Sequence, residues 1–375
     1  MAVTETRRGS STPATPQHPT LESTFDPRHN SLTMMRLALA TLVAVSHAMV
    51  IGFGHQPTFH TDPRLGSTTM GDLAVDGFFV ISGFLVTMSF LRLPSIGRYL
   101  WHRSVRIFPA FYACLILTAL VVAPIVAALE GRPALSVFPE SLTFITHNAA
   151  LHMFRFDVAG LPVGTENPGV INGALWTLYY EFVCYLGVIV LGVIGALKRR
   201  AWLLLAAIGV LWAANIVHTT GLVELPAWQM RRLTFLFLLG TAGYVYARHV
   251  RIGRVAALVS LIVVAVAVTT LPDYRALAAP AFAYLCLWAM VRLPFTWNPR
   301  TDLSYGMYIF HWPVAVILAL LGAGGLGLVP FVAVVVLGTG LVALVSWHLI
   351  ESPALSRKAM VAPWSRSRAG DLRAG

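Results

Sequence analysis

Long apolar stretches, separated by short charged or Pro/Gly-rich breaks, dominate this chain of 375 residues. About ten of them approach 20 residues, the length that an α-helix needs to cross a ~30 Å hydrocarbon layer. The helices of a soluble protein would carry polar stripes, whereas several of these runs carry no charge. We therefore predict an all-α, polytopic membrane protein with about ten transmembrane helices, at 34–53, 72–91, 107–128, 174–196, 201–217, 233–247, 255–271, 276–291, 303–322 and 329–350.

Composition supports a membrane protein, since 57% of the residues are hydrophobic, 11% are charged and the mean hydropathy is +0.72. If the ten runs alternate sides, 21 of the 27 Lys and Arg residues fall on the side of the N-terminus. Basic residues collect on the cytoplasmic side of membrane proteins, so both termini are expected in the cytoplasm. The same asymmetry accounts for the net charge of +11 without a nucleic-acid partner.

The ends of the chain and one loop lack membrane-spanning character. Residues 1–30 are rich in Ser, Thr and Pro and are expected to form a disordered cytoplasmic tail, and 354–375 a basic cytoplasmic tail. The apolar segment 141–153 is too short to span a bilayer and is expected to be interfacial or re-entrant. It lies in the long external loop 130–173. The three cysteines are scattered in apolar runs, and no metal site is expected.

Arg36 and His47 are unexpected in the first apolar run, RLALATLVAVSHAMV. Ionisable groups at membrane depth are costly and usually face a bundle interior or a water-filled cavity. Eleven residues of helix end about 20° beyond three full turns, so the two side chains share a face, roughly 16 Å apart. The alternatives are that Arg36 is a topology signal that reaches the interface and that His47 is a hydrogen-bonded core histidine.

Asp76 lies in the second run, GDLAVDGFFVISGFLV, about one turn from its outer end. Two antiparallel neighbouring helices would place this carboxylate near the level of His47. A carboxylate beside an imidazole fixes its tautomer and stabilises its charged form, which a general base requires. The alternative is that Asp76 caps its helix.

Two further runs add polar candidates. NGALWTLYYEFVCYL places Glu181 among aromatic residues, of which Trp176 and Tyr180 are candidate substrate contacts or part of an interfacial belt. SYGMYIFHWP places His311 near mid-membrane, and Pro313 predicts a bent helix beside a cavity.

A basic cluster, RYLWHRSVRIFPAFY, is expected in a cytoplasmic loop. Arg103 and Arg106, three residues apart, would point from one face of a helix start. Guanidinium groups bind phosphates bidentately, so a phosphate-bearing donor is the expected ligand, with a plain topology signal as the alternative.

These stretches occur in one order over residues 31 to 353, and in that order the chain resembles the acyltransferase 3 family. RLALATLVAVSHA matches its Arg and His with ten residues between them, RSVRIFPAFY its Arg-x-x-Arg pattern, and VDGFFVISGFLV, LWTLYYEFVCYL and SYGMYIFHWPV follow the family in turn. The resemblance implies an integral-membrane acyltransferase domain over 31–353. It also implies a cytoplasmic acyl-coenzyme A donor, bound through Arg36, Arg103 and Arg106, and a hydroxyl acceptor on the far side of the membrane.

The expected function is an O-acyltransferase of the inner (plasma) membrane that moves an acyl group, by default acetyl from acetyl-CoA. The acceptor would be a cell-surface carbohydrate, such as a polysaccharide or lipopolysaccharide, or a glycosylated metabolite. His47 would act as general base or transient nucleophile, Asp76 would orient it, and Glu181 would hold the sugar or donate a proton. His311 is a further candidate substrate contact. The rival function is a proton-coupled secondary transporter that uses the same ionisable residues as a relay.

Overall fold

The structure is a computed structural model that describes residues 19–59, 68–221, 223–294 and 301–360. Secondary structure in these ranges is helical apart from isolated β-bridges, which confirms the all-α prediction for the described residues. The α-helices are α1 (Leu21–Thr24), α2 (Leu32–Phe53), α3 (Met70–Arg92), α4 (Ile96–Leu117), α5 (Ala123–Leu129), α6 (Phe138–Asn148), α7 (Thr177–Val193), α8 (Trp202–Thr219), α9 (Trp228–Val245), α10 (Arg254–Thr270), α11 (Arg275–Arg292), α12 (Ser304–Leu320), α13 (Leu328–Ser346) and α14 (Ser352–Ser356).

Short 3₁₀ and π turns complete the architecture. The 3₁₀ turns are η3 (Ala134–Val137), η4 (Ala323–Leu326) and η6 (Arg357–Met360), and the π turns are η2 (Thr118–Val122) and η5 (Trp347–Glu351). Each π turn continues a neighbouring α-helix, so that α4, η2 and α5 form one rod and α13, η5 and α14 another.

Every one of the ten predicted apolar runs coincides with a helix or a rod of this kind. Five segments within the described residues are long and apolar enough to cross a membrane: Leu32–Phe53, Met70–Arg92, Ile96–Leu129, Trp202–Thr219 and Leu328–Ser356. Three shorter apolar helices, Thr177–Val193, Arg254–Thr270 and Ser304–Leu320, accompany them. These helices indicate a multi-pass membrane protein, and the count of about ten crossings stays a prediction.

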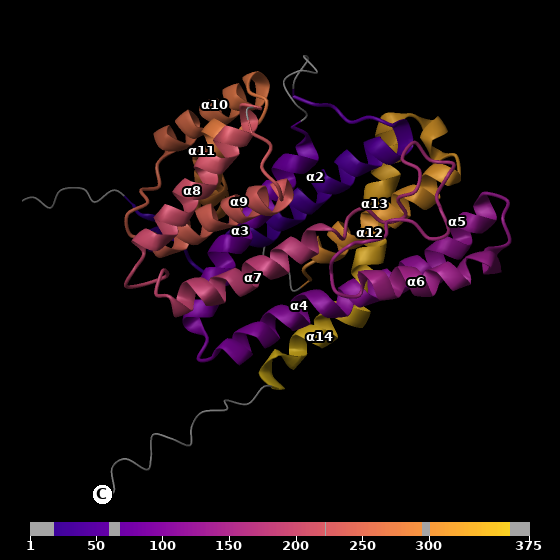
Figure 1. The fold of residues 1–375 in the computed structure, drawn as a ribbon, viewed down its shortest axis with the longest axis horizontal. Helices are drawn as coiled ribbons and strands as arrows, with labels where there is room; N and C mark the ends of the chain where they lie inside the picture. The colour runs from indigo at the N-terminus through magenta and orange to yellow at the C-terminus, as the bar shows by residue number, and fades with distance from the viewer. Residues whose placement is uncertain (1–18, 60–67, 222, 295–300, 361–375) are drawn as a thin grey trace, which may run out of the picture.

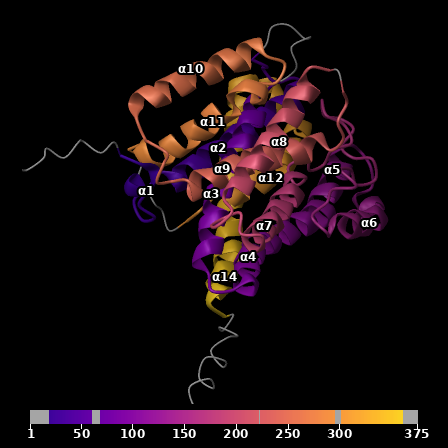
Figure 2. The ribbon, with the colours of Figure 1, turned by 60° about the vertical axis from the view of Figure 1, so that its left-hand side comes forward.

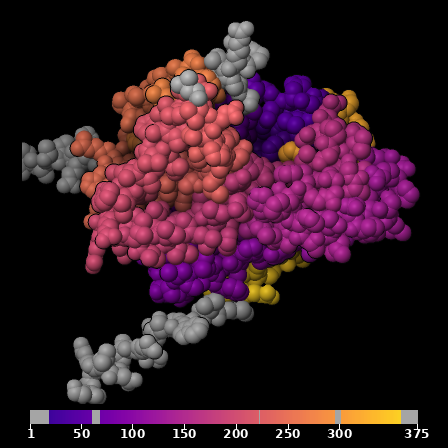
Figure 3. Space-filling model, in the orientation of Figure 1, coloured from indigo at the N-terminus to yellow at the C-terminus, as the bar shows by residue number. Residues whose placement is uncertain are grey.

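The central helices are α2, α3, α9 and α12, where α3 packs against α9 and α2, and α12 against α2 and α13 (Figure 1). The α10–α11 pair flanks this centre on one side, and α5 and α6 lie on the other, as the two views show (Figures 1 and 2). On the face shown in Figure 3, the chain from α5 to α8, coloured magenta to pink, covers most of the central helices. The buried polar residues described below lie in and around this central bundle.

Two glycines allow α3 and α9 to cross in backbone contact. A Cβ on Gly83 would collide with the carbonyl oxygen of Phe237, and a Cβ on Gly240 would collide with that of Val80. Next to this crossing, the hydroxyls of Thr87 and Thr241 are 3.1 Å apart. Small residues at such crossings are typical of membrane helices, because close packing replaces the hydrophobic driving force that water would supply.

The structure corrects two expectations about segments outside the bundle. Residues 19–30 belong to the expected disordered tail, yet Leu21 is fully buried and its N–H donates to the carbonyl of Val250 at 2.8 Å. Burial of this leucine and backbone pairing with the segment after α9 provide the ordering contacts, whereas residues 1–18 and 361–375 lie outside the described residues. The basic cluster expected in a loop instead forms the first turns of α4, which Ser95 caps by accepting from the Arg98 N–H at 3.2 Å.

We predict that Gly83→Ala lowers stability by about 1–3 kcal/mol, because the added methyl group must push two backbones apart. Thermal unfolding of the detergent-purified protein measures the change. Gly209→Ala in α8 is the matched control, since no atom lies within 4 Å of its new Cβ. Equal melting temperatures for the two variants would contradict the close crossing.

Candidate active site

A cavity of about 500 Å³ runs along α3 between the central helices. The α3 residues that line it extend from Val75 to Arg92. Eighteen residues of helix cover about 27 Å, close to the ~30 Å thickness of a hydrocarbon layer. The cavity is therefore long enough to receive an extended chain from one side of the membrane.

One end of the cavity is strongly basic. Five cationic side chains line it, against one carboxylate, Glu181. The cationic residues are Arg36, Arg92, Arg103, Arg106 and Lys358. A cavity with this charge and with apolar walls suits a ligand that combines several negative charges with a neutral chain.

Asp302 joins two of these cations. Its Oδ2 accepts from Arg36 Nη1 and from Arg106 Nη2, each at 2.8 Å. Burial would raise the pKa of this loop carboxyl, but the two guanidinium groups outweigh burial and hold its pKa below the usual range. Asp302 is itself positioned by the start of α12, since its Oδ1 accepts from the N–H and the hydroxyl of Ser304 at 3.2 and 2.6 Å.

Arg103 is the less constrained of the expected phosphate ligands. Its Nη2 donates weakly to Ser89 Oγ at 3.4 Å, and its guanidinium lies over the ring of Tyr185 at 5.7 Å. Its buried Nε has no hydrogen-bond partner among the described residues. The structure thus places Arg36, Arg103 and Arg106 on one cavity, and donor binding by them stays a prediction.

Glu181 faces the same cavity. Its Oε1 accepts from the hydroxyl of Tyr185 at 2.6 Å and from that of Ser82 at 3.3 Å. These two hydroxyls therefore hold the Glu181 carboxylate in place at the cavity wall.

The deep end of the cavity is closed by side chains of α3, α7 and α12. The hydroxyls of Thr177 and Tyr308 are 2.6 Å apart, and the ring of Phe78 packs edge-on against Tyr308 with centroids 5.6 Å apart. The ring of His311 lies 6.3 Å from that of Tyr308, and neither His311 nor His47 lines the cavity. Three side chains thus separate the cavity from the histidines.

His47 and His311 form a hydrogen-bonded pair that joins α2 to α12. His47 Nδ1 lies 2.7 Å from His311 Nε2, and His311 is completely buried. Because His311 Nδ1 lies 3.2 Å from the carbonyl oxygen of Met307, that nitrogen carries the hydrogen. The Nε2 of a neutral His311 then accepts from His47 Nδ1–H.

This arrangement assigns the tautomer of His47. With its hydrogen on Nδ1, a neutral His47 has a lone pair on Nε2, which has no hydrogen-bond partner among the described residues. An imidazole with a free Nε2 and an oriented Nδ1–H is equipped to accept a proton from a nearby hydroxyl. His311 was expected to contact substrate, which stays a prediction; in the structure it is hydrogen-bonded to His47.

Residues 149–176, which connect α6 to α7, pack beside the His47–His311 pair. Pro313 has no N–H, so the helix leaves the carbonyl of Ile309 free, and Asn172 Nδ2 donates to it at 3.2 Å. Trp312 Nε1 donates to the carbonyl of Val170 at 2.9 Å, and its ring packs 4.7 Å from that of His47. Gly173 makes room for this indole, since a Cβ there would come within 2.7 Å of it.

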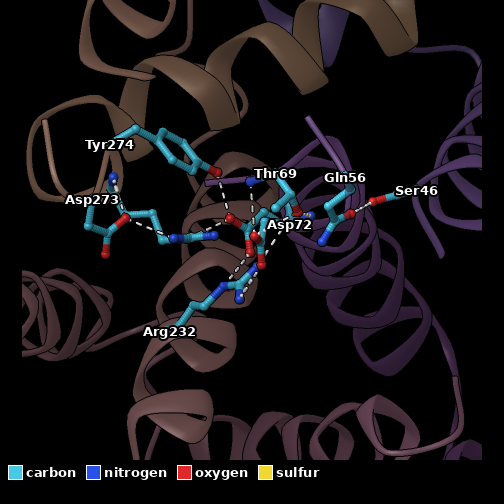
Figure 4. Close-up of polar contacts among 9 residues, drawn as sticks. Ser46, Gln56, Thr69, Asp72, Arg232, Asp273 and Tyr274 are labelled. Carbon is cyan, nitrogen blue, oxygen red and sulfur yellow. Dashed lines mark hydrogen bonds and ion pairs between the residues drawn. The ribbon is translucent and has the colours of Figure 1, made fainter. Parts of the chain in front are cut away.

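Asp76 does not contact His47, so the expected orienting pair is wrong. Its carboxylate is fully buried and binds Arg232 Nε at 3.0 Å, Arg275 Nε at 2.6 Å and the Tyr274 hydroxyl at 2.6 Å. Figure 4 shows this cluster, in which Asp72 also pairs with Arg232. The two arginines outcompete an imidazole because they are permanently charged and aligned for hydrogen bonding.

Other predicted contacts lie away from the cavity. Trp176 and Tyr180 pack edge-to-face at 5.5 Å and are absent from the cavity lining, which leaves a role in acceptor binding as a prediction. In the segment 130–173, which was expected to be a long external loop, Glu166 lies against Gly54 at the end of α2, and its N–H donates to the carbonyl of Ile51 at 3.3 Å. Glu166 thus lies beside the last turn of α2, one to two turns beyond His47.

The sequence analysis missed Asp302, Trp312 and Asn172. Asp302 could have been identified from the sequence, because it is an acidic residue two positions before a helix start, at the end of the bundle where the arginines collect. Pro313 was a signal for Asn172, because a proline inside a helix leaves a carbonyl in need of a donor. No group of three or more His, Cys, Asp or Glu suited to a metal occurs in the part of the chain that the structure describes.

Comparisons with known proteins identify the family of the chain. A family profile described as an acyltransferase domain matches residues 29–350. An O-acetyl transferase of Shigella phage Sf6 is 27% identical over 342 residues, which cover 88% of this chain and 97% of the relative. Nodulation protein 10 of Rhizobium leguminosarum bv. viciae is 28% identical over 375 residues, covering 89% and 95%. No solved structure matches the chain.

The family match includes Asp302, the histidine pair and every described residue that lines the cavity except Lys358. It leaves only the ends of the chain outside. The chain therefore belongs to the acyltransferase 3 family of enzymes.

Proposed function

We propose that this enzyme is an O-acyltransferase of the inner (plasma) membrane that moves acetyl from cytoplasmic acetyl-CoA to a hydroxyl of a surface carbohydrate or glycosylated metabolite. The observation that carries the proposal is the basic cavity that reaches to within one side-chain layer of the histidine pair. The name of one relative, an O-acetyl transferase, supports the acetyl group. Both termini would lie in the cytoplasm, at the basic end of the cavity.

The residues present fit an acyl-coenzyme A donor. The arginines at the mouth, with the unpaired Nε of Arg103, match the phosphates of its nucleotide part. The narrow apolar stretch along α3 matches its neutral pantetheine arm, and Glu181 can accept from the amide N–H groups of that arm. The thioester then faces Phe78, Thr177 and Tyr308 at the deep end.

Transfer requires that this wall open. When Tyr308 and Phe78 move aside, His47 is the next group along the path, since it is bonded to His311 one turn beyond Tyr308. His47 Nε2 takes the proton of the acceptor hydroxyl as its oxygen bonds to the thioester carbonyl carbon. The C–S bond breaks, and the proton passes from His47 to the departing thiolate, which leaves His47 neutral for another cycle.

The structure gives the transporter alternative little support. A relay would need Arg36, His47, Asp76 and Glu181 along one path. Asp76 is instead held by two arginines, and Glu181 by two hydroxyls.

We predict that His47→Gln lowers kcat by about 10²–10⁴, the usual effect of removing a general base. The assay measures transfer of radiolabel from acetyl-CoA to extracted cell-envelope glycans by the purified protein. His249→Gln, at an exposed histidine, is the control and should leave kcat unchanged. Full turnover by a folded His47→Gln protein would refute the base role.

The same assay separates orientation by His311 from simple packing. His311→Gln keeps an oxygen that can accept from His47 Nδ1–H, whereas His311→Leu fills space without an acceptor. We expect the Gln variant to retain more activity, and only the Leu variant to change the pH dependence of kcat. Equal loss in both variants, with an unchanged pH profile, would indicate a structural role alone.

We predict that Phe78→Ala lets the enzyme use longer acyl groups, because the ring closes the deep end of the cavity. The ratio of kcat/KM for butyryl-CoA to that for acetyl-CoA should rise about tenfold, in the range that one or two methylenes give in an apolar pocket. Leu85→Ala, which enlarges the cavity about two turns further toward the cytoplasm, is the control. An equal change in both variants would show that Phe78 does not limit the acyl chain.

A further inference from the structure

The C-terminal turn η6 contributes a side chain to the mouth of the cavity. Trp101 Nε1 on α4 donates to the carbonyl of Arg357 at 3.1 Å, and η6 packs against α4. The next residue, Lys358, lines the cavity together with the arginines of α2, α3 and α4. It is the one cationic lining residue that lies beyond the membrane-spanning helices.

Lys358 has positive neighbours and no negative partner of its own. No ion pair or hydrogen bond links its ammonium to another described residue. The carboxylate whose charge acts on it, Asp302, is already bound by Arg36 and Arg106. Burial first, and then Arg106, Arg103 and Arg36, lower the pKa of Lys358 to about 8, with Asp302 opposing them weakly.

Such a position is unfavourable for a lysine unless an anion is bound there. Like charges in a partly buried cavity repel, and the repulsion is relieved when one multivalent anion contacts several of them. The chain contains only two lysines, and the other, Lys198, is exposed in the turn between α7 and α8. The docked C-terminal turn thus brings a primary amine to the site where the arginines already gather.

We propose that Lys358 binds the phosphate groups of the acyl-coenzyme A nucleotide, so that the C-terminal turn completes the donor site. This inference rests on the proposed function and extends it to a residue outside the matched domain, which ends at residue 350. Its ammonium acts as a point donor to phosphate oxygens, in addition to the guanidinium groups of the helices. Docking of η6 on α4 holds this donor over the cavity.

The two lysines allow a direct test on the wild-type protein. Both amines are labelled with isotopic acetic anhydride near pH 8 and quantified by mass spectrometry of their peptides. Acetyl-CoA should lower the labelling rate of Lys358 about tenfold, the effect of one charge-assisted hydrogen bond, and leave Lys198 unchanged. S-acetylpantetheine, which has no phosphate, should protect neither lysine.

Kinetics of variants provide a second test. Lys358→Gln should raise the KM for acetyl-CoA about tenfold with little change in kcat, and Lys358→Arg should restore most of the loss. The KM for S-acetylpantetheine should be the same in wild type and Lys358→Gln. Lys198→Gln is the matched control and should behave as wild type with both donors.

The outcomes distinguish this inference from the proposed function. An active wild-type protein in which acetyl-CoA leaves the labelling of Lys358 unchanged would overturn the inference and leave the proposed function standing. Protection of Lys358 by acetyl-CoA in a protein that transfers no acyl group would overturn the proposed function and support the binding site. Equal protection by S-acetylpantetheine would overturn the phosphate contact.

Discussion

The two ion pairs of Asp302 set the geometry of the donor side. A guanidinium group in a bilayer-sized bundle is costly unless it is paired, and one carboxylate pairs with both Arg36 of α2 and Arg106 of α4. Because Asp302 lies two residues before α12 and accepts from Ser304, the same contact fixes where that helix begins. The helix start in turn determines where His311 meets His47. The basic mouth and the histidine pair are thus two ends of one arrangement.

The surroundings of His47 depend on an interruption in the hydrogen bonding of that same helix, α12. Pro313 leaves a carbonyl without a partner, and Asn172 supplies the missing donor from the α6–α7 connection. This bond brings the connection onto the bundle, where Gly173 and Val170 receive the indole of Trp312 beside His47. A break in regular helix is tolerated at membrane depth only when other groups satisfy it. Here the groups that satisfy it also shape the surroundings of the proposed base.

Hydrophobic run length was enough to locate the helices, because the cost of burying unpaired backbone in lipid leaves few alternatives to a helix. It did not predict where α4 begins, since Ser95 caps a basic segment that looked like a loop. Spacing along α2 placed Arg36 and His47 on one face, but the partners of a buried charge depend on which helices pack together. Asp76 therefore forms ion pairs with Arg232 of α9 and Arg275 of α11, whereas His47 is hydrogen-bonded to His311 of α12.

The central claim is one continuous path from a cytoplasmic donor site to an acceptor on the opposite side. Sealed inside-out membrane vesicles that contain the enzyme test it most directly, when radiolabelled acetyl-CoA is added outside and acetylated glycan is measured in the lumen. The account predicts label on luminal glycan while acetyl-CoA itself stays outside. Label only after the vesicles are permeabilised, so that donor and acceptor share one compartment, would contradict it.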